Sequence, residues 1–163
     1  MCGIAGIVQN HPGTGDSSAV IRGMTEALRH RGPDGEGYAF LPQPGAAPGQ
    51  AHIALGHRRL AILDLSRAGA QPMRSRDGRF TIALNGEIFN YREMRAELGG
   101  PFHSGTDTEV LVEACAAWGV GKTLNRANGM FAFALWDSLE AELTLARDRC
   151  GEKPLVYFRG VRG

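Results

Sequence analysis

The run that most constrains the fold is Met130-Phe131-Ala132-Phe133-Ala134-Leu135-Trp136, because it is apolar at both of its alternating sets of positions. Successive side chains of a strand point to opposite faces of a sheet. The run therefore predicts a central strand that is covered by other structure on both faces. A single sheet with one face in solvent cannot accommodate it, so the domain must be layered.

Shorter apolar runs bounded by turn residues predict further strands at Gly3–Val8, Tyr38–Leu41, His52–Leu55, Leu60–Leu63, Arg79–Leu84, Leu143–Ala146 and Leu155–Phe158. Helices are predicted from Ser17 or Ser18 to Gly32-Pro33, from Tyr91 with Asn90 as N-cap, and from the capping box Thr106-x-x-Glu109. Residues 9–16 and the proline-rich residues 42–49 are predicted to be loops. Strands outnumber helices and cluster in hairpins. We therefore expect one α+β domain over residues 1–163, with stacked sheets and helices outside them.

Composition excludes several classes of partner. The formal net charge is +1, and no basic run suits nucleic acid or an anionic membrane surface. No segment is typical of a signal peptide or a membrane span. Cys2, Cys115 and Cys150 are an odd number of widely spaced thiols, which predicts a cytoplasmic protein without disulfides, with Cys115 in the core. The histidines never fall at metal-ligand spacing, so no metal site is expected.

Cys2 is the first candidate for chemistry. Removal of Met1 would make it the N-terminal residue, with a thiol and a free α-amine on one Cα. An α-amine titrates near ~7.7–8.0 and a thiol near ~8.5, so the amine can act as the base for its own thiol. An N-terminal amine is an established activator of such a nucleophile. Taken alone, a Cys after Met is better explained by packing in a strand, and only the downstream motifs favour the catalytic interpretation.

Three other positions have both a structural and a functional interpretation. Asn85-Gly86-Glu87 carries the strongest short hairpin signal, yet the next residues do not pair back before the helix at Tyr91. Arg58 and Arg59 must point to opposite faces of a strand, so one of them can face inward toward an anion. Asp107 lies in the first turn of a helix, where the helix dipole alone favours a carboxylate.

Six segments together resemble one family: Met1-Cys2-Gly3-Ile4, Arg31-Gly32-Pro33-Asp34-Gly35, Gly56-His57-Arg58-Arg59-Leu60-Ala61-Ile62, Asn85-Gly86-Glu87-Ile88-Phe89-Asn90, Thr106-Asp107-Thr108-Glu109 and Gly129-Met130-Phe131-Ala132-Phe133-Ala134. The chain resembles the class II glutamine amidotransferases. The order of the segments is similar to that in the N-terminal glutaminase half of asparagine synthetases. Each motif is weak alone, but six in register over almost the whole chain are specific.

The resemblance implies the N-terminal-nucleophile hydrolase fold, a four-layer αββα sandwich of two mainly antiparallel sheets. It also implies that Cys2 attacks the side-chain amide of L-glutamine and forms a thioester, which water hydrolyses to glutamate. The Asn85 amide and the Gly86 N–H would hold the tetrahedral oxyanion, at what we expect to be the end of a strand.

The same resemblance assigns the glutamine-binding residues. Arg59, followed by Leu60 and Ile62, matches the residue that binds the substrate α-carboxylate. Glu87 and Asp107 match the acceptors for the α-ammonium. Arg31 and Gly32 match a loop near the nucleophile. Arg58, by strand alternation, should face away from the site as a surface or ion-pair residue.

Two departures from the family pattern bear on the acceptor of ammonia. Cys150 and Glu152 stand where many asparagine synthetases have apolar residues, so an acceptor other than aspartate is an alternative. No Ser-Gly-Gly-x-Asp-Ser loop is present, so ATP and Mg are expected only in a synthetase domain absent from this chain. The expected partners are glutamine, a synthetase domain or subunit that receives ammonia, and, as one option, a second copy in a homodimer.

Two other functions are compatible with the same residues. One is a non-catalytic glutamine-binding regulatory domain, which would use Arg59, Glu87 and Asp107 without turnover. The other is a self-processing amidase of the same fold. That class needs an internal nucleophile exposed by cleavage, whereas only Met1 precedes Cys2.

Overall fold

A computed structural model describes residues 1–9, 17–42 and 53–160. Its strands are β1 (Gly3–Val8), β2 (Gly35–Leu41), β3 (Ile53–Arg59), β4 (Met73–Arg74), β5 (Phe80–Ile88), β6 (Gly129–Asp137) and β7 (Glu142–Arg147). Its helices are α1 (Ser17–Ala27), α2 (Tyr91–Leu98), α3 (Asp107–Trp118) and α4 (Val120–Arg126), with short 3-10 turns at Arg29–Arg31 and Arg67–Gly69. Apart from residues 9 and 42, the two predicted loops lie outside the described residues, as does His52.

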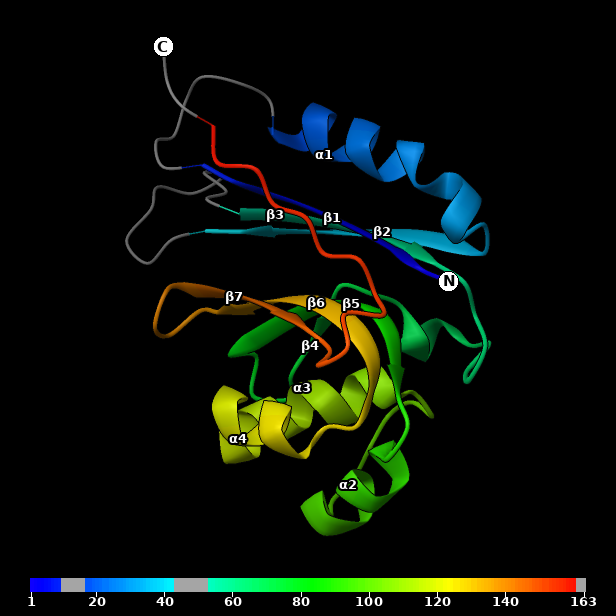
Figure 1. Ribbon diagram of the computed structural model, residues 1–163, viewed down its shortest axis with the longest axis vertical. Coiled ribbons are helices and arrows are strands. Elements are labelled where there is room, and N and C mark those ends of the chain that lie inside the picture. The colour runs from blue at the N-terminus through cyan, green and yellow to red at the C-terminus, as the bar shows by residue number, and fades with distance from the viewer. Residues whose placement is uncertain (10–16, 43–52, 161–163) are drawn as a thin grey trace.

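The strands form two antiparallel sheets that face each other. One has the order β1-β3-β2 and the other the order β4-β5-β6-β7. Helix α1 covers the outer face of the first sheet, while α3 and α4 cover the outer face of the second (Figure 1). The predicted four-layer αββα sandwich is therefore confirmed. None of the helices within the described ranges is long and apolar enough to cross a membrane.

Strand β6 has the two covered faces that its sequence predicts. Phe131, Phe133 and Leu135 pack into the core that the second sheet shares with its helices. Ala134 and Trp136 point the other way, into the core between the two sheets. Cys115 of α3 is buried in the helical core as predicted, and burial raises the pKa of its thiol to about 12. That pKa keeps the Cys115 thiol protonated and unreactive at neutral pH.

Arg58 is buried and forms ion pairs with Glu26 of α1 and, at 2.9 Å, with Glu36 of β2. Its side chain therefore ties the outer helix to the first sheet. The prediction that Arg58 faces away from the site and forms ion pairs is confirmed, whereas a surface position is wrong.

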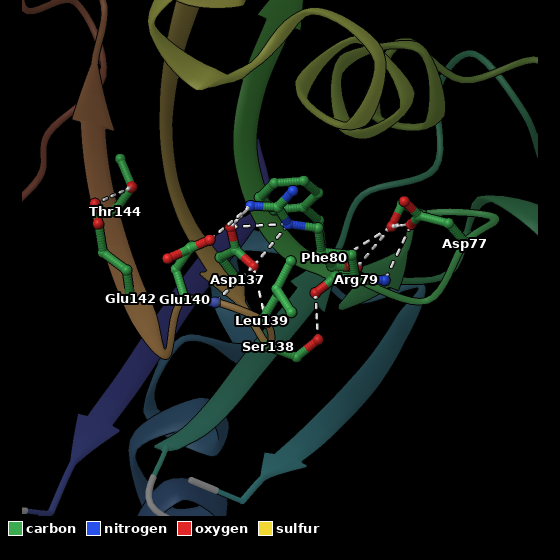
Figure 2. A network of polar contacts seen from close by, with 10 residues as sticks. Asp77, Arg79, Phe80, Asp137, Ser138, Leu139, Glu140, Glu142 and Thr144 are labelled. Atoms are coloured by element: carbon green, nitrogen blue, oxygen red, sulfur yellow. Dashed lines mark hydrogen bonds and ion pairs between the residues drawn. The ribbon is translucent and has the colours of Figure 1, made fainter. Parts of the chain in front are cut away.

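A second charged network holds the end of the other sheet (Figure 2). Arg79 Nε lies 2.9 Å and 3.0 Å from the two carboxylate oxygens of Asp137, and Arg79 Nη2 lies 2.6 Å from Oδ2. Asp137 also accepts the N–H groups of Leu139 and Glu140 in the turn after β6. The pair fixes the register of β5 against β6 at the end remote from Asn85.

Two predicted strands are wrong. Strand β3 runs through Gly56–Arg59 without interruption and ends at Arg59, so Leu60–Leu63 is an irregular segment. The N–H of Leu60 donates to Cys2 Sγ instead of to a neighbouring strand. Leu155–Phe158 pairs with no described strand, and Val156 and Phe158 are each 90% exposed. Apolar composition predicted both segments as strands, but a strand also requires a neighbour with free backbone groups.

The predicted caps are correct in position and only partly correct in detail. Asn90 precedes α2, but its side chain joins Arg126 O and Asn128 N and makes no cap hydrogen bond. Thr106 Oγ1 accepts the Glu109 N–H at 3.3 Å, which is half of a capping box. The Glu109 carboxylate binds the N–H groups of the preceding turn, at residues 103 and 104, and forms no bond with the Thr106 N–H.

Candidate functional site

One cavity brings all of the predicted site residues together. They arrive from chain segments that are far apart in the sequence: Cys2, then Arg59, Leu60 and Ile62, then Asn85, Gly86 and Glu87, and finally Asp107. The cavity opens where β1 begins, β3 ends and α3 begins, close to the middle of β5. The convergence was predicted only through the family resemblance, because no local pattern places these segments side by side.

Cys2 immediately precedes β1, and its half-buried thiol lies on the wall of the cavity. Cys2 Sγ lies 3.4 Å from the Leu60 N–H nitrogen, which donates to it. Cys2 Sγ in turn lies 3.8 Å from the Leu60 carbonyl oxygen, to which the thiol donates, so both backbone groups of Leu60 hold the sulfur in place. Arg31 Nε donates to the carbonyl oxygen of Cys2 at 3.1 Å, so the predicted Arg31 loop does lie beside Cys2.

Arg59 is the last residue of β3, and its guanidinium holds the segment that follows. Nη1 donates to the carbonyl of Ser66 at 2.7 Å, and Nη2 donates to the carbonyl of Asp64. Ile62 and Leu63 line the cavity within this segment, and both side chains are exposed. Arg59 therefore supplies a positive charge to the cavity and also shapes its wall.

Asn85 and Gly86 do not lie at a strand end or in a hairpin turn, so that expectation is wrong. Both lie inside β5, paired in register with Ala132 and Phe131 of β6. The Asn85 side chain is buried, and within the described residues its Oδ1 has no hydrogen-bond partner. A buried carbonyl oxygen without a protein partner can accept a hydrogen bond from a ligand, whereas holding an oxyanion would use the Nδ2 donor of the same carboxamide.

The backbone pairing of β5 with β6 determines the direction of the Gly86 N–H. Its partner Phe131 directs its N–H to Asp148 Oδ2 at 3.2 Å and accepts the Asp148 N–H at 2.8 Å. Opposed residues of an antiparallel pair exchange both hydrogen bonds or neither. Gly86 therefore exchanges none with Phe131, and its N–H points to the other edge of β5, which lines the cavity.

Within the described part of the chain, Asp107 and Glu87 are two of the three acidic residues that line the cavity, the third being Asp64. Asp107 is the buried first residue of α3, and its Oδ2 accepts the Ile88 N–H at 2.8 Å. Burial raises the pKa of the Asp107 carboxyl, and the neighbouring charge of Glu87 adds to that increase. A cation bound between the two carboxylates would relieve their mutual repulsion.

The structure adds cavity residues that the sequence analysis missed. Gln71 lines the cavity, as does Lys153, whose Nζ lies 2.9 Å from Met1 Sδ and 3.2 Å from Met130 Sδ. Gln71 is in an irregular stretch and Lys153 in a polar turn, so no periodic signal marks either. Among the described residues no group of three or more His, Cys, Asp or Glu side chains could hold a metal ion.

Comparison with known proteins places the chain in a family. The family described as "Glutamine amidotransferase domain" matches residues 1–162. The chain belongs to this glutamine amidotransferase family. Its resemblance to the class II amidotransferases, predicted from six motifs, is thereby confirmed.

The amidotransferase domain is similar to the asparagine synthetase [glutamine-hydrolyzing] 1 of Bacillus subtilis, with 38% identity over 96% of this chain and 24% of the relative. A putative asparagine synthetase [glutamine-hydrolyzing] of Mycobacterium tuberculosis is 36% identical over 100% of this chain and 26% of the relative. Amidase chry2 of Gibberella zeae is 34% identical over 96% of this chain and 24% of the relative. The chain thus spans about a quarter of the length of these relatives.

A solved structure supports the fold. The glutamine phosphoribosylpyrophosphate amidotransferase of Bacillus subtilis superposes with a TM-score of 0.61 and 24% identity, over 76% of this chain and 33% of the other. At that identity the likeness concerns the fold alone. The predicted N-terminal-nucleophile hydrolase architecture of this amidotransferase domain is therefore confirmed.

Proposed function

We propose that this domain hydrolyses L-glutamine to L-glutamate and ammonia, with Cys2 as the nucleophile once Met1 has been removed. The observation that supports this most directly is the single cavity. Several functional groups converge on it from separate parts of the chain: a thiol, a guanidinium, two carboxylates, a buried carboxamide and the Gly86 N–H that points away from β6. These are the groups that a zwitterionic amide substrate and its tetrahedral intermediate require.

Substrate selection follows from the charges. The Arg59 guanidinium binds the α-carboxylate of glutamine, and Glu87 with Asp107 accepts hydrogen bonds from its α-ammonium. Leu60 and Ile62 line the same wall and contact the aliphatic part of the substrate. A free amino acid carries both charges, whereas a residue within a peptide carries neither. The cavity thus favours free glutamine.

The reaction balances without a cofactor. The Cys2 α-amine takes the thiol proton, the sulfur adds to the amide carbon, and the amide oxygen becomes an oxyanion held by Asn85 and the Gly86 N–H. The C–N bond then breaks and ammonia leaves with the proton from the amine. Water adds to the thioester, the C–S bond breaks, and glutamate departs as the thiol regains a proton.

The ammonia is proposed to pass to a synthetase domain or subunit, because the relatives are named glutamine-hydrolyzing asparagine synthetases. ATP and Mg would be needed only there. Aspartate is the first candidate for the acceptor, and another carboxylic acid is the alternative. A homodimer and a cytoplasmic location remain parts of the proposal.

Glutamate release tests the proposal. Cys2→Ala should abolish it, while Cys150→Ala, which changes an exposed thiol away from the cavity, should leave it unchanged. Intact-mass measurement of the active protein should show that Met1 is absent. Equal glutamate release from the wild type and Cys2→Ala would refute the enzymatic proposal. Glutamine binding without any turnover would indicate a regulatory domain instead.

A further inference from the structure

The cavity edge of β5 carries a row of backbone N–H groups at every second residue. Ile82 is paired in register with Met73 of β4, the short edge strand of this sheet. Leu84, Gly86 and Ile88 follow on the same edge, where β4 no longer covers them. Open edge groups of this kind need other partners.

Side chains supply those partners on both sides of Gly86. Gln71 Oε1 accepts the Leu84 N–H at 2.7 Å, and Asp107 Oδ2 accepts the Ile88 N–H at 2.8 Å. By continuing the β4–β5 register, Gln71 is the residue opposite Leu84. Its carboxamide takes the place of the missing strand and leaves the next N–H of the row, that of Gly86, facing the cavity.

Leu84 is held from its other backbone group as well. His57 Nε2 lies 3.2 Å from the Leu84 carbonyl oxygen and reaches it from the first sheet. Gln71 Nε2 in turn donates to Thr108 Oγ1 at 3.1 Å, in the first turn of α3. Gln71 and His57 therefore fix the backbone immediately before Asn85 from two directions. Thr108 in turn anchors the Gln71 carboxamide.

We infer that Gln71 is a positioning residue of the oxyanion hole. Through the Leu84 N–H, it sets the distance between the Asn85–Gly86 backbone and the reacting carbon. The inference rests on the proposed glutamine hydrolysis. It concerns the transition state, because Gln71 acts on the groups that hold the oxyanion and not on those that bind the α-carboxylate or α-ammonium.

The main variant is Gln71→Met, which keeps the length of the side chain and removes both hydrogen bonds. Loss of a whole oxyanion donor lowers kcat by roughly 10²–10³. A donor that is retained but displaced should lower kcat less, by about 10- to 100-fold, with KM for glutamine within about threefold of the wild type. Kinetics are normalised to reactive Cys2 thiol, so a smaller folded fraction does not alter kcat.

A binding measurement separates positioning from general damage. An aldehyde analogue of glutamine accepts the Cys2 sulfur at its carbonyl carbon, and the former carbonyl oxygen then occupies the oxyanion site. L-Glutamate binds without forming such an oxygen. Gln71→Met should weaken the aldehyde by the same factor as kcat and leave the glutamate affinity unchanged.

Two further variants keep the test decisive if Gln71→Met folds poorly. Thr108→Val removes the hydroxyl that anchors the Gln71 carboxamide and keeps the backbone N–H that Thr108 donates to Asp107, and should lower kcat about 3- to 10-fold with unchanged KM. Thr123→Val removes a buried hydrogen bond to Gly119 O in the turn before α4, away from the cavity, and should lower stability without changing kcat.

The outcomes are distinct. Wild-type protein without Cys2-dependent glutamate release would refute the proposed function itself. An active wild type with normal kcat in both Gln71→Met and Thr108→Val would refute only the positioning role. Parallel losses of aldehyde and glutamate affinity would also refute it, because they would place Gln71 in ground-state binding.

Discussion

Gly86→Ala is the most informative single substitution, because it strains the strand at the proposed oxyanion donor. A Cβ at this position would lie 2.2 Å from Met130 O and 2.5 Å from Phe131 Cα, where an ordinary contact begins at 3.4 Å. Both atoms belong to the backbone of β6, so neither can rotate away. The φ angle of Gly86 is also +156°, a conformation that residues with side chains rarely adopt.

The expected magnitudes follow from these distances. Strand β5 must move from β6 by about 1 Å, and the free energy of unfolding should fall by about 3 kcal/mol, at the upper end of overpacking effects. For a domain of this size that corresponds to a Tm lower by roughly 6–12 °C. The same displacement moves the Gly86 N–H, and a misplacement of about 1 Å can lower kcat about 100-fold.

The assay combines thermal unfolding with glutamate release per reactive thiol. Gly23→Ala is the matched control, because Gly23 lies in α1 and its added Cβ would meet nothing within 4 Å. That variant should gain about 0.5–1 kcal/mol from helix propensity and keep its kcat. If Gly86→Ala unfolded at the wild-type Tm and kept its kcat within twofold, the close approach of β5 and β6 would be wrong.

Three further outcomes are expected. Arg59→Ala should weaken glutamine binding by about 2–5 kcal/mol, measured as KM or by calorimetry, because the substrate carboxylate loses its partner; normal affinity would remove Arg59 from the site. Burial lowers the pKa of His57 to about 4, so between pH 6.5 and 4 the unfolded chain binds a proton that the native state excludes. As the pH is lowered over this range, the free energy of unfolding should therefore fall by about 1.4 kcal/mol per pH unit, and urea unfolding of His57→Gln should lack this pH dependence. An unchanged pH dependence in the variant would contradict a buried neutral His57. Arg79 lowers the pKa of Asp137, so the contribution of this ion pair to the free energy of unfolding is present above pH ~4 and is lost as the pH falls below that value. Asp137→Asn should thus cost about 1–3 kcal/mol at pH 7, with a smaller difference at pH 3, and an equal difference at both would refute the ion pair.

The sequence by itself determined the layering and selected the candidate site residues. The doubly apolar run over residues 130–136 requires cover on both faces, and β6 has it. Local caps and breaks located α1, α2 and α3 to within a residue or two at their starts. Six motifs in order then indicated the family and, with it, Cys2, Arg59, Asn85 and Asp107. Each of these signals is local or depends on order along the chain.

Only the tertiary structure decided which backbone groups remain free. Leu60–Leu63 looks like a strand, but its first N–H meets the Cys2 sulfur, so the strand ends at Arg59. Asn85 and Gly86 look like a turn, but β6 continues alongside them. Gln71 has no signal in the sequence, and only the structure places it opposite Leu84, just before β4 begins. Periodicity reports which side chains are buried, whereas an unpaired N–H depends on partners distant in the sequence.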